Sequence, residues 1–210
     1  MKLIVITPAR DIDDEQSLVT KMFESGLQTL HLRKPKYSTN RLKEYIKQIP
    51  EHFHDRIIIH THHDLALKFK LKGIHLGKIH LSKKWRYFYV RFRLRLRFDH
   101  VSKSRSYSRL QQLFAKEERS YDYFLLGTMY NNMTGELYSG FYEAGLTNAL
   151  KTSGKKVIAR GGTSVSSIEK SIKYGFHGIA FNSYIWGAEQ PYERFMNILN
   201  EFERLEIELE

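Results

Sequence analysis

The chain of 210 residues contains no cysteine. This absence excludes disulfides, thiolate metal sites and a cysteine nucleophile, and it fits a reducing compartment. Charge-free stretches of membrane-spanning length are also missing, and the apolar start Met1–Pro8 is too short for a signal peptide core. Proline is scarce, with four residues, and no segment has the composition of a linker. We therefore expect one cytoplasmic domain over residues 1–210 that spans no membrane.

Acidic residues are nearly missing from one part of the chain. The net charge is +11, and the segment Lys68–Arg105 holds 13 Lys and Arg against one acid, Asp99. Such a basic block suggests contact with phosphates, nucleic acid or an acidic surface, whereas the plain alternative is a solvated face. The aromatic and basic residues of Trp85–Phe98 could stack on bases. No nucleic-acid-binding motif is present, so a nucleic-acid-binding module is the remote alternative.

What the chain does contain is an alternation of short apolar runs and amphipathic segments. The apolar runs predict buried strands and the amphipathic segments predict helices, which is typical of an α/β protein. Strands are predicted at Leu3–Thr7, Gln28–Arg33, Ile57–His60, Gly73–Leu76, within Lys83–Arg97 where arginines alternate with apolar residues, and at Tyr123–Gly127, Val157–Ala159 and Gly178–Phe181. Helices are predicted at Asp14–Ser25, Thr39–Ile49, Asp64–Phe69, Ser106–Lys116, Phe141–Lys151, Ser164–Tyr174 and Pro191–Leu205. Eight strands, each with its connector, predict a single (β/α)8 TIM barrel.

The segment Val157–Ser183 combines a strand, a glycine pair, a helix and a second strand, which is a βαβ unit. Gly161 and Gly162 follow the first strand, so their backbone N–H groups approach an anion without hindrance from a Cβ atom. Asn182 and Ser183 end the second strand and add N–H groups at a helix start. Barrels of this kind often hold a phosphate in the loops after strands seven and eight. We predict a phosphate site at these four residues; the alternative is that the glycines only form a turn.

Histidine gathers at the predicted strand ends, where a barrel keeps its active site. The histidines at or just past these ends are His31, His60, His62, His63, His80 and His100. Imidazole titrates near neutral pH, so His100 and His60 are the candidate catalytic groups for proton transfer. A metal bound by His60, His62 and His63 is a weaker alternative, because these residues lack helical spacing and a partner acid. His75 lies within a strand, where packing is expected rather than reaction.

Six short stretches at strand ends carry a further signal. They are Leu30–Lys34, Asp64–Ala66, Gly73–Gly77, Gly127–Tyr130, Ala159–Gly162 and Gly178–Ser183. In this order and spacing they make the chain resemble the thiamine phosphate synthase/TenI family of small barrels over nearly its whole length. The resemblance implies a barrel of thiamine biosynthesis that binds small phosphorylated thiazole and pyrimidine ligands. Synthases of the family join hydroxymethylpyrimidine diphosphate to thiazole phosphate with loss of diphosphate, and TenI-type members include a cofactor-free thiazole tautomerase.

The resemblance also assigns ligand contacts. Arg33 matches an arginine that binds diphosphate, with Lys34 beside it, and Thr134 matches a threonine in the loop after the sixth strand. The thiazole phosphate cradle of the family falls on the four residues predicted above as a phosphate site. Two independent considerations, glycine chemistry and family resemblance, thus agree on that site.

The family's Mg²⁺ site matches poorly. Its two aspartates fall on Thr61 and His80, and the lysine of the loop after the sixth strand falls on Gly135. Mg²⁺ requires hard oxygen ligands, and neutral imidazole is a poor substitute. The resemblance thus implies Mg²⁺ as cofactor, whereas the residues predict weak or absent Mg²⁺-dependent synthesis. A synthase, a tautomerase and a non-catalytic phosphate-binding barrel stay open.

Overall fold

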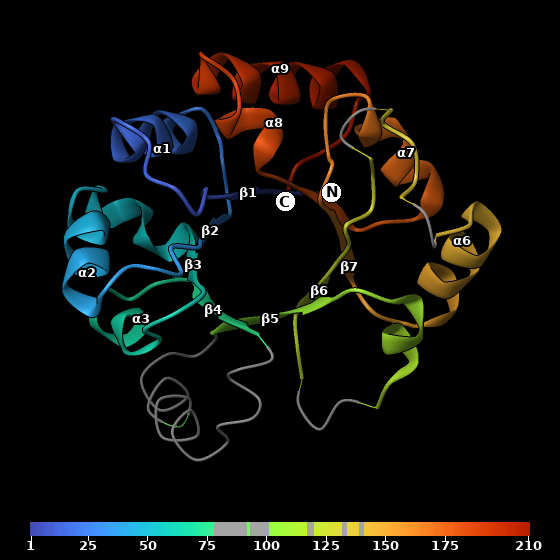
Figure 1. The fold of residues 1–210 in the computed structure, drawn as a ribbon, viewed down its shortest axis with the longest axis horizontal. Helices are drawn as coiled ribbons and strands as arrows, with labels where there is room; N and C mark the ends of the chain where they lie inside the picture. The colour runs from blue at the N-terminus through green and yellow to red at the C-terminus, as the bar shows by residue number, and fades with distance from the viewer. Residues whose placement is uncertain (78–91, 93–100, 117–119, 132–133, 139–140) are drawn as a thin grey trace. The chain divides into compact units, whose positions relative to one another are not determined.

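The computed structural model describes residues 1–77, 92, 101–116, 120–131, 134–138 and 141–210 (Figure 1). Eight parallel strands follow one another around a closed barrel in the order of the sequence. The strands are β1 (Lys2–Ile6), β2 (Leu30–Leu32), β3 (Ile57–Ile59), β4 (Gly73–Leu76), β5 (Ser102–Tyr107), β6 (Tyr123–Leu126), β7 (Val157–Arg160) and β8 (Gly178–Phe181). The predicted (β/α)8 barrel is confirmed.

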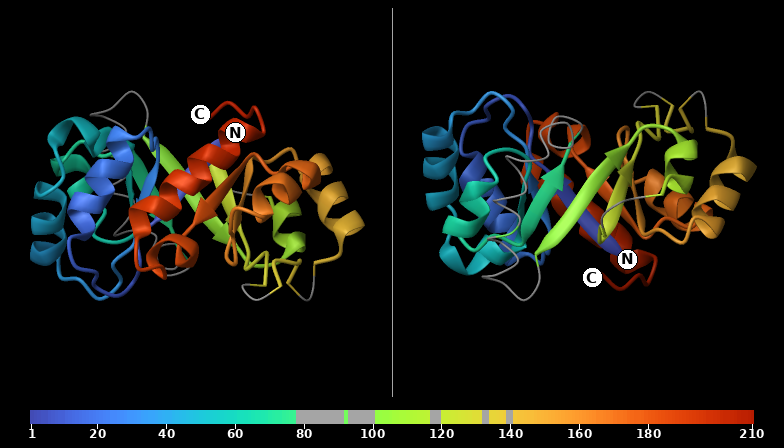
Figure 2. Two further views of the ribbon diagram at one scale, coloured as in Figure 1. Left: turned by 90° about the horizontal axis from the view of Figure 1, so that it is seen from above. Right: turned by 90° about the horizontal axis from the view of Figure 1, so that it is seen from below.

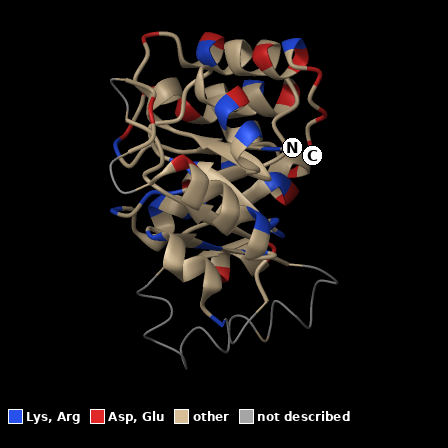
Figure 3. Cartoon of the chain, turned by 90° about the vertical axis from the view of Figure 1, so that its right-hand side faces the viewer, with Lys and Arg blue, Asp and Glu red and all other residues tan. Residues whose placement is uncertain are grey.

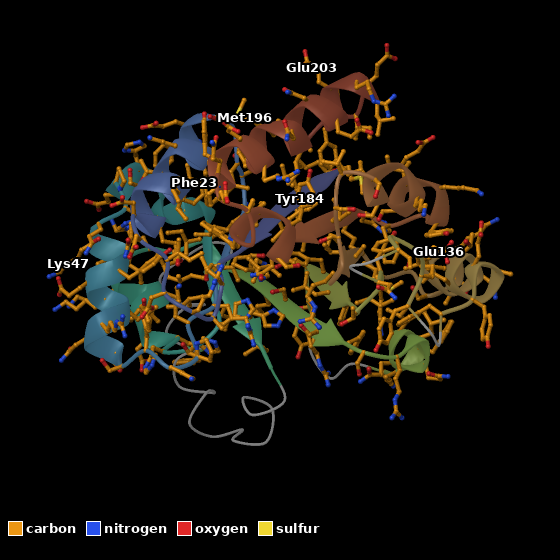
Figure 4. The ribbon with its side chains drawn as sticks, turned by 45° about the horizontal axis from the view of Figure 1, so that its top comes forward. Phe23, Lys47, Glu136, Tyr184, Met196 and Glu203 are labelled. Carbon is orange, nitrogen blue, oxygen red and sulfur yellow. The ribbon has the colours of Figure 1, made fainter. Side chains whose placement is uncertain are left out.

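Helices with one apolar face follow most of the strands. The described α-helices are α1 (Glu15–Glu24), α2 (Thr39–Lys47), α3 (Asp64–Lys68), α6 (Glu143–Thr152), α7 (Ser167–Tyr174), α8 (Ser183–Trp186) and α9 (Pro191–Arg204), and the short 3-10 helices are η1 (Glu51–Arg56) and η2 (Leu110–Phe114). Their apolar faces follow the predicted spacing: Phe23 of α1 is 1% exposed, whereas Lys47 extends outward from the end of α2 (Figure 4). None of the described helices is long and apolar enough to cross a membrane.

The contacts divide the chain into two compact units, Ile6–Arg105 and Met1–Val5 with Ser106–Glu210. In the first unit, the three isoleucines of β3 are fully buried between β2 and β4, with which β3 pairs. In the second unit, β8 pairs with both β1 and β7, and α9 lies outside β1 and β8 (Figures 1 and 2). Acidic and basic residues are mixed on α9 (Figure 3). The single domain over residues 1–210 stays a prediction.

The predicted pairing of the two strands around the glycine pair is confirmed. In β7 and β8, Ile158 pairs with Gly178 and Ala159 pairs with Ile179. A Cβ atom at Gly178 would meet the carbonyl oxygen of Lys2, so only glycine allows β8 to approach β1 this closely. Both glycine-bounded strands, β4 and β8, have the bounds that the sequence predicts.

The prediction for the fifth strand was wrong. The alternating pattern within Lys83–Arg97 lies outside the described residues, and the fifth strand of the barrel is Ser102–Tyr107. The helix predicted at Ser106–Lys116 begins only at Leu110, as the 3-10 helix η2. The cause is that β5 buries small serines, Ser102 and Ser104, in place of an apolar run. β4 approaches β5 closely here: a Cβ atom at Gly73 would overlap the backbone of Ser102, so position 73 requires glycine.

Most of the basic block Lys68–Arg105 also lies outside the described residues. Of its described members, Lys72 is half-buried, and its ammonium donates to Gln28 O and Thr29 Oγ1 at 2.8 and 2.9 Å. Lys103 and Arg105 alternate with buried serines along β5. This part of the block therefore belongs to the barrel wall.

Candidate functional site

Three histidines of the first unit come together at β2, β3 and β4. His31 lies in β2, His60 directly follows β3 and His75 lies in β4. The rings of His60 and His75 stack with centroids 4.2 Å apart, and the His31 ring is 5.1 Å from that of His60. Nδ1 of His31 and Nε2 of His60 share a hydrogen bond of 2.9 Å. We call these three residues the histidine cluster.

The surroundings of His60 keep its ring neutral. Burial lowers the pKa of His60 well below its ordinary value, and His75, His31 and Arg33 lower it further through charge repulsion. A neutral imidazole offers a lone pair to a proton or to an electrophile. His60, predicted as a candidate for proton transfer, is therefore in the basic form near neutral pH.

The sequence predicted the wrong partners for His60. The described residues hold a group with metal-ligand spacing at His31, His60 and His75, instead of His60, His62 and His63. His62 is committed elsewhere: its Nε2 donates to Tyr37 O at 2.9 Å, and its Nδ1 bonds Thr39 Oγ1 at 2.8 Å. His75, expected only to pack, packs against a second imidazole. The missed signal is one histidine on, or directly after, each of three successive strands.

Two cations predicted to bind diphosphate differ sharply in exposure. Arg33 is exposed, and its backbone N–H donates to Thr7 Oγ1 at 2.8 Å. Lys34 is 1% exposed, and its ammonium donates to Glu15 Oε2 at 2.5 Å and to Arg10 O at 2.8 Å. Arg33 is therefore accessible from solvent, whereas Lys34 holds the loop after β2 against the start of α1.

A buried network explains the position of Lys34. The other carboxylate oxygen of Glu15 accepts a hydrogen bond of 2.7 Å from the Tyr45 hydroxyl of α2. Burial raises the pKa of the Glu15 carboxyl, although the hydrogen bonds from Lys34 and Tyr45 lower it. Since an unpaired buried charge is costly, each member of this network requires the others.

In the second unit, the loop after β7 has a backbone conformation that favours glycine. Gly161 and Gly162 have φ angles of +87° and +68°, which are left-handed. The carbonyl oxygen of Gly161 accepts from Tyr130 N at 3.0 Å, and a Cβ atom on Gly161 would lie 3.0 Å from Thr128 Cα. The loops after β6 and β7 therefore touch through their backbones. We call Arg160–Thr163 the glycine loop.

Asn182 and Ser183 lie at the end of β8, the strand next to the glycine loop. Asn182 precedes α8, and its carbonyl oxygen accepts from Ile185 N and Trp186 N, both at 3.0 Å. The hydroxyl of Thr163 donates to Ala180 O at 2.8 Å and ties the glycine loop to β8. All four residues of the predicted phosphate site therefore lie at the ends of two paired strands.

The sequence of this barrel matches a known protein family. The family model described as thiamine monophosphate synthase matches residues 3–185. The chain belongs to the thiamine monophosphate synthase family.

Relatives of the chain carry matching names. A thiamine-phosphate synthase of Methanococcus maripaludis is 24% identical over 194 residues, which cover 90% of this chain and 88% of the relative. A thiamine-phosphate synthase of Aquifex aeolicus is 22% identical over 172 residues, covering 80% of this chain and 77% of the relative. A thiamine phosphate pyrophosphorylase structure from Bacteroides thetaiotaomicron is 26% identical, with a TM-score of 0.77 over 97% of this chain and 98% of that chain.

The thiamine monophosphate synthase family is generally Mg²⁺-dependent, and neither residue at the predicted metal positions, Thr61 or His80, carries a carboxylate. At one family metal position stands Thr61, whose buried Oγ1 has no hydrogen-bond partner among the described residues. The other position, His80, lies outside them, as does the candidate base His100. Within the described part, the group with metal-ligand spacing consists of imidazoles and contains no carboxylate. Mg²⁺ prefers oxygen ligands, so this set does not suit it.

Two cations near the loops of the second unit were missed by sequence reasoning. Thr134 is exposed, and the next residue, Gly135, occupies the position of the family lysine. The carbonyl oxygen of Gly135 accepts a hydrogen bond of 3.1 Å from Lys170 of α7, which brings an ammonium group to this loop. Arg160 of the glycine loop donates to Gly127 O at 3.1 Å. No local pattern in the sequence links Lys170 to Gly135, because they are far apart in the chain.

Proposed function

We propose that this chain binds thiazole phosphate and thiamine phosphate in the cytoplasm as part of thiamine biosynthesis. Gly161, Gly162, Asn182 and Ser183 bind the phosphate group. The observation that carries the proposal is a pair of left-handed glycines at the end of β7, beside the end of β8, in a thiamine monophosphate synthase family barrel. Successive backbone N–H groups in a turn form an anion-binding concavity.

The site is made of backbone groups, and this property explains how it persists beside changed side chains. A backbone N–H donor is present whatever the residue type, provided that the residue can adopt the required φ angle. Side-chain cations near the loop, Arg160 and Lys170, are already bonded to carbonyl oxygens and add positive charge at longer range. Thr134 is exposed on the neighbouring loop and adds a hydroxyl.

Synthesis is the step for which this chain is poorly equipped. Loss of diphosphate builds negative charge on its oxygens, which cations must stabilise. Arg33 is exposed and supplies one cation; Lys34 is held by Glu15, so we propose a structural role for it instead of phosphate binding. Each missing stabilising group costs about 10²–10³ in rate. We therefore propose that Mg²⁺-dependent synthesis is weak or absent.

Thiazole tautomerisation is the second candidate function. It requires a group that moves a proton between two atoms of a heterocycle, and the neutral imidazole of His60 is suited to this. His100 is the other candidate for this role. If His60→Gln and His100→Gln both leave tautomerase turnover unchanged, proton transfer by these residues is excluded.

A calorimetric titration with thiazole phosphate tests the proposed phosphate site. Gly162→Ala places a side chain at φ +68°, and Gly154→Ala does the same at φ +63° with nothing within 4 Å of the new Cβ atom. Both variants carry similar backbone strain, but only Gly162 belongs to the proposed site. We expect Gly162→Ala to weaken binding at least tenfold and Gly154→Ala to leave it unchanged. Equal affinity of folded Gly162→Ala and the unaltered protein would overturn the site.

A further inference from the structure

The histidine cluster has a composition that the proposed phosphate site does not explain. One ring nitrogen from each of His31, His60 and His75 lies within 4.8 Å of one from each of the others. These residues come from three neighbouring strands of the first unit, so the barrel backbone fixes their spacing. Structural packing alone does not require three adjacent imidazoles, because apolar side chains fill strand interiors at lower desolvation cost.

We propose that His31, His60 and His75 bind one Zn²⁺-type ion. In tetrahedral zinc sites the metal–nitrogen distance is about 2.0–2.1 Å, so ligand nitrogens lie about 3.3 Å apart. Nδ1 of His31 and Nε2 of His60 are 2.9 Å apart, and one ring nitrogen of each histidine lies within 4.8 Å of one from each of the other two. Small rotations of the rings therefore bring all three nitrogens to coordination distance of one ion.

The contacts around the cluster resemble those of metal-binding imidazoles. Metal-bound histidines are usually oriented by a hydrogen bond to their second ring nitrogen. Nδ1 of His75 shares such a bond with Ser104 Oγ of β5 at 2.8 Å, and both residues are buried. Ser104 therefore orients His75 for coordination.

The donor type determines the ion. Three imidazole nitrogens favour zinc, copper or nickel over magnesium, which requires oxygen. The chain has no cysteine. No thiolate site elsewhere in the protein can therefore compete with the histidine cluster for zinc. Sites with three protein ligands keep a fourth position for water or a substrate atom. The cluster is thus expected to hold a cation whose fourth position takes an oxygen or nitrogen donor. While a metal is bound, the coordinating nitrogen of His60 has no lone pair for a proton, so proton transfer by His60 belongs to the metal-free protein.

Cobalt is the probe for this site, because tetrahedral Co²⁺ absorbs visible light where Zn²⁺ does not. The full-length protein is freed of metal with a chelator, then titrated with Co²⁺ and afterwards with Zn²⁺. We expect one equivalent of Co²⁺ to give a tetrahedral spectrum, which Zn²⁺ then removes. Absence of that spectrum from the unaltered protein would overturn the proposal.

Variants separate the cluster from the other histidines. His60 is half-buried, so the His60→Gln variant is expected to fold and to lose the cobalt spectrum. Ser104→Ala is expected to weaken Co²⁺ binding about 10–100-fold. His52→Gln, at an exposed position, and His62→Gln, of the alternative predicted from the sequence, are the matched controls that keep it. A folded His60→Gln protein with unchanged Co²⁺ affinity would contradict the assignment.

A second measurement covers the case in which a cluster variant fails to fold. A ligand that binds only the native state raises the unfolding midpoint with its concentration. Zn²⁺ should raise the midpoint of the unaltered protein, and an unchanged midpoint would again contradict the proposal. Gly162→Ala should keep the cobalt spectrum, so loss of phosphate binding and loss of metal binding are distinguishable.

Discussion

The strand ends of the two units present polar groups in different ways. In the unit Ile6–Arg105, side chains do this: the histidine cluster and the hydroxyl of Thr61. In the unit containing Ser106–Glu210, the backbone does it, at glycines whose φ angles are positive. A side-chain site changes its chemistry with one substitution, while a backbone site depends only on conformation. Under the proposed function, this difference allows a family member to exchange side chains at the metal positions and to keep a phosphate loop.

The largest expected effect comes from breaking the side-chain network of the first unit. Glu15→Gln leaves the buried ammonium of Lys34 without its carboxylate, and loss of one partner of a buried ion pair costs about 3–5 kcal/mol. We expect the free energy of unfolding, measured in urea, to fall by about that amount. The matched control Glu44→Gln removes the exposed partner of Lys47 and should change little. Similar stabilities of the two variants would show that the buried pair does not hold this unit together.

A smaller effect is expected from the backbone of the second unit. Gly161→Ala forces a side chain into a left-handed conformation, which costs about 1–2 kcal/mol, and adds a tight contact of 3.0 Å with Thr128 Cα. Gly175→Ala carries the same strain at φ +92°, but nothing lies within 4 Å of its Cβ atom. In denaturant unfolding, Gly161→Ala should therefore have a lower free energy of unfolding than Gly175→Ala. The reverse order would mean that the loops after β6 and β7 are not closely packed.

The smallest effect concerns the pH dependence of Tyr130, which hydrogen-bonds the glycine loop through its backbone and Ser171 through its hydroxyl. Burial raises the pKa of Tyr130 to about 12. This pKa is raised above the unfolded value of about 10. The stabilisation of the folded state by the neutral Tyr130 phenol is therefore complete below pH 10 and is lost as pH rises through 12. At about pH 11 the loss amounts to about 1 kcal/mol.

Tyr130→Phe isolates this contribution from other alkaline titrations. The difference in unfolding free energy between the unaltered protein and Tyr130→Phe should shrink between about pH 9 and pH 11. A difference that stays constant over this range would contradict the buried, neutral phenol.

Much of the fold could be predicted from the sequence because apolar runs and glycines mark the strands. Gly73–Leu76 and Gly178–Phe181 begin at glycines and have the predicted bounds. β5 could not be predicted, since Ser102–Tyr107 is polar and owes its place to the close approach of β4. Local periodicity carries no information on such an approach.

The candidate site was predictable where it depends on backbone. Gly161 and Gly162 stand beside each other in the sequence, so their loop is visible there. The histidine cluster brings together three positions that are far apart in the chain, and only the strand register joins them. For the same reason the burial of Lys34 could not be predicted: Lys34 lies in the loop after β2, and its partner Glu15 lies in α1.

Titration of the unaltered protein with thiazole phosphate, first with a chelator and then with Mg²⁺, tests the central claim most directly. If the backbone of the glycine loop binds the phosphate, calorimetry will give the same affinity under both conditions. Binding that appears only when Mg²⁺ is added would contradict this account.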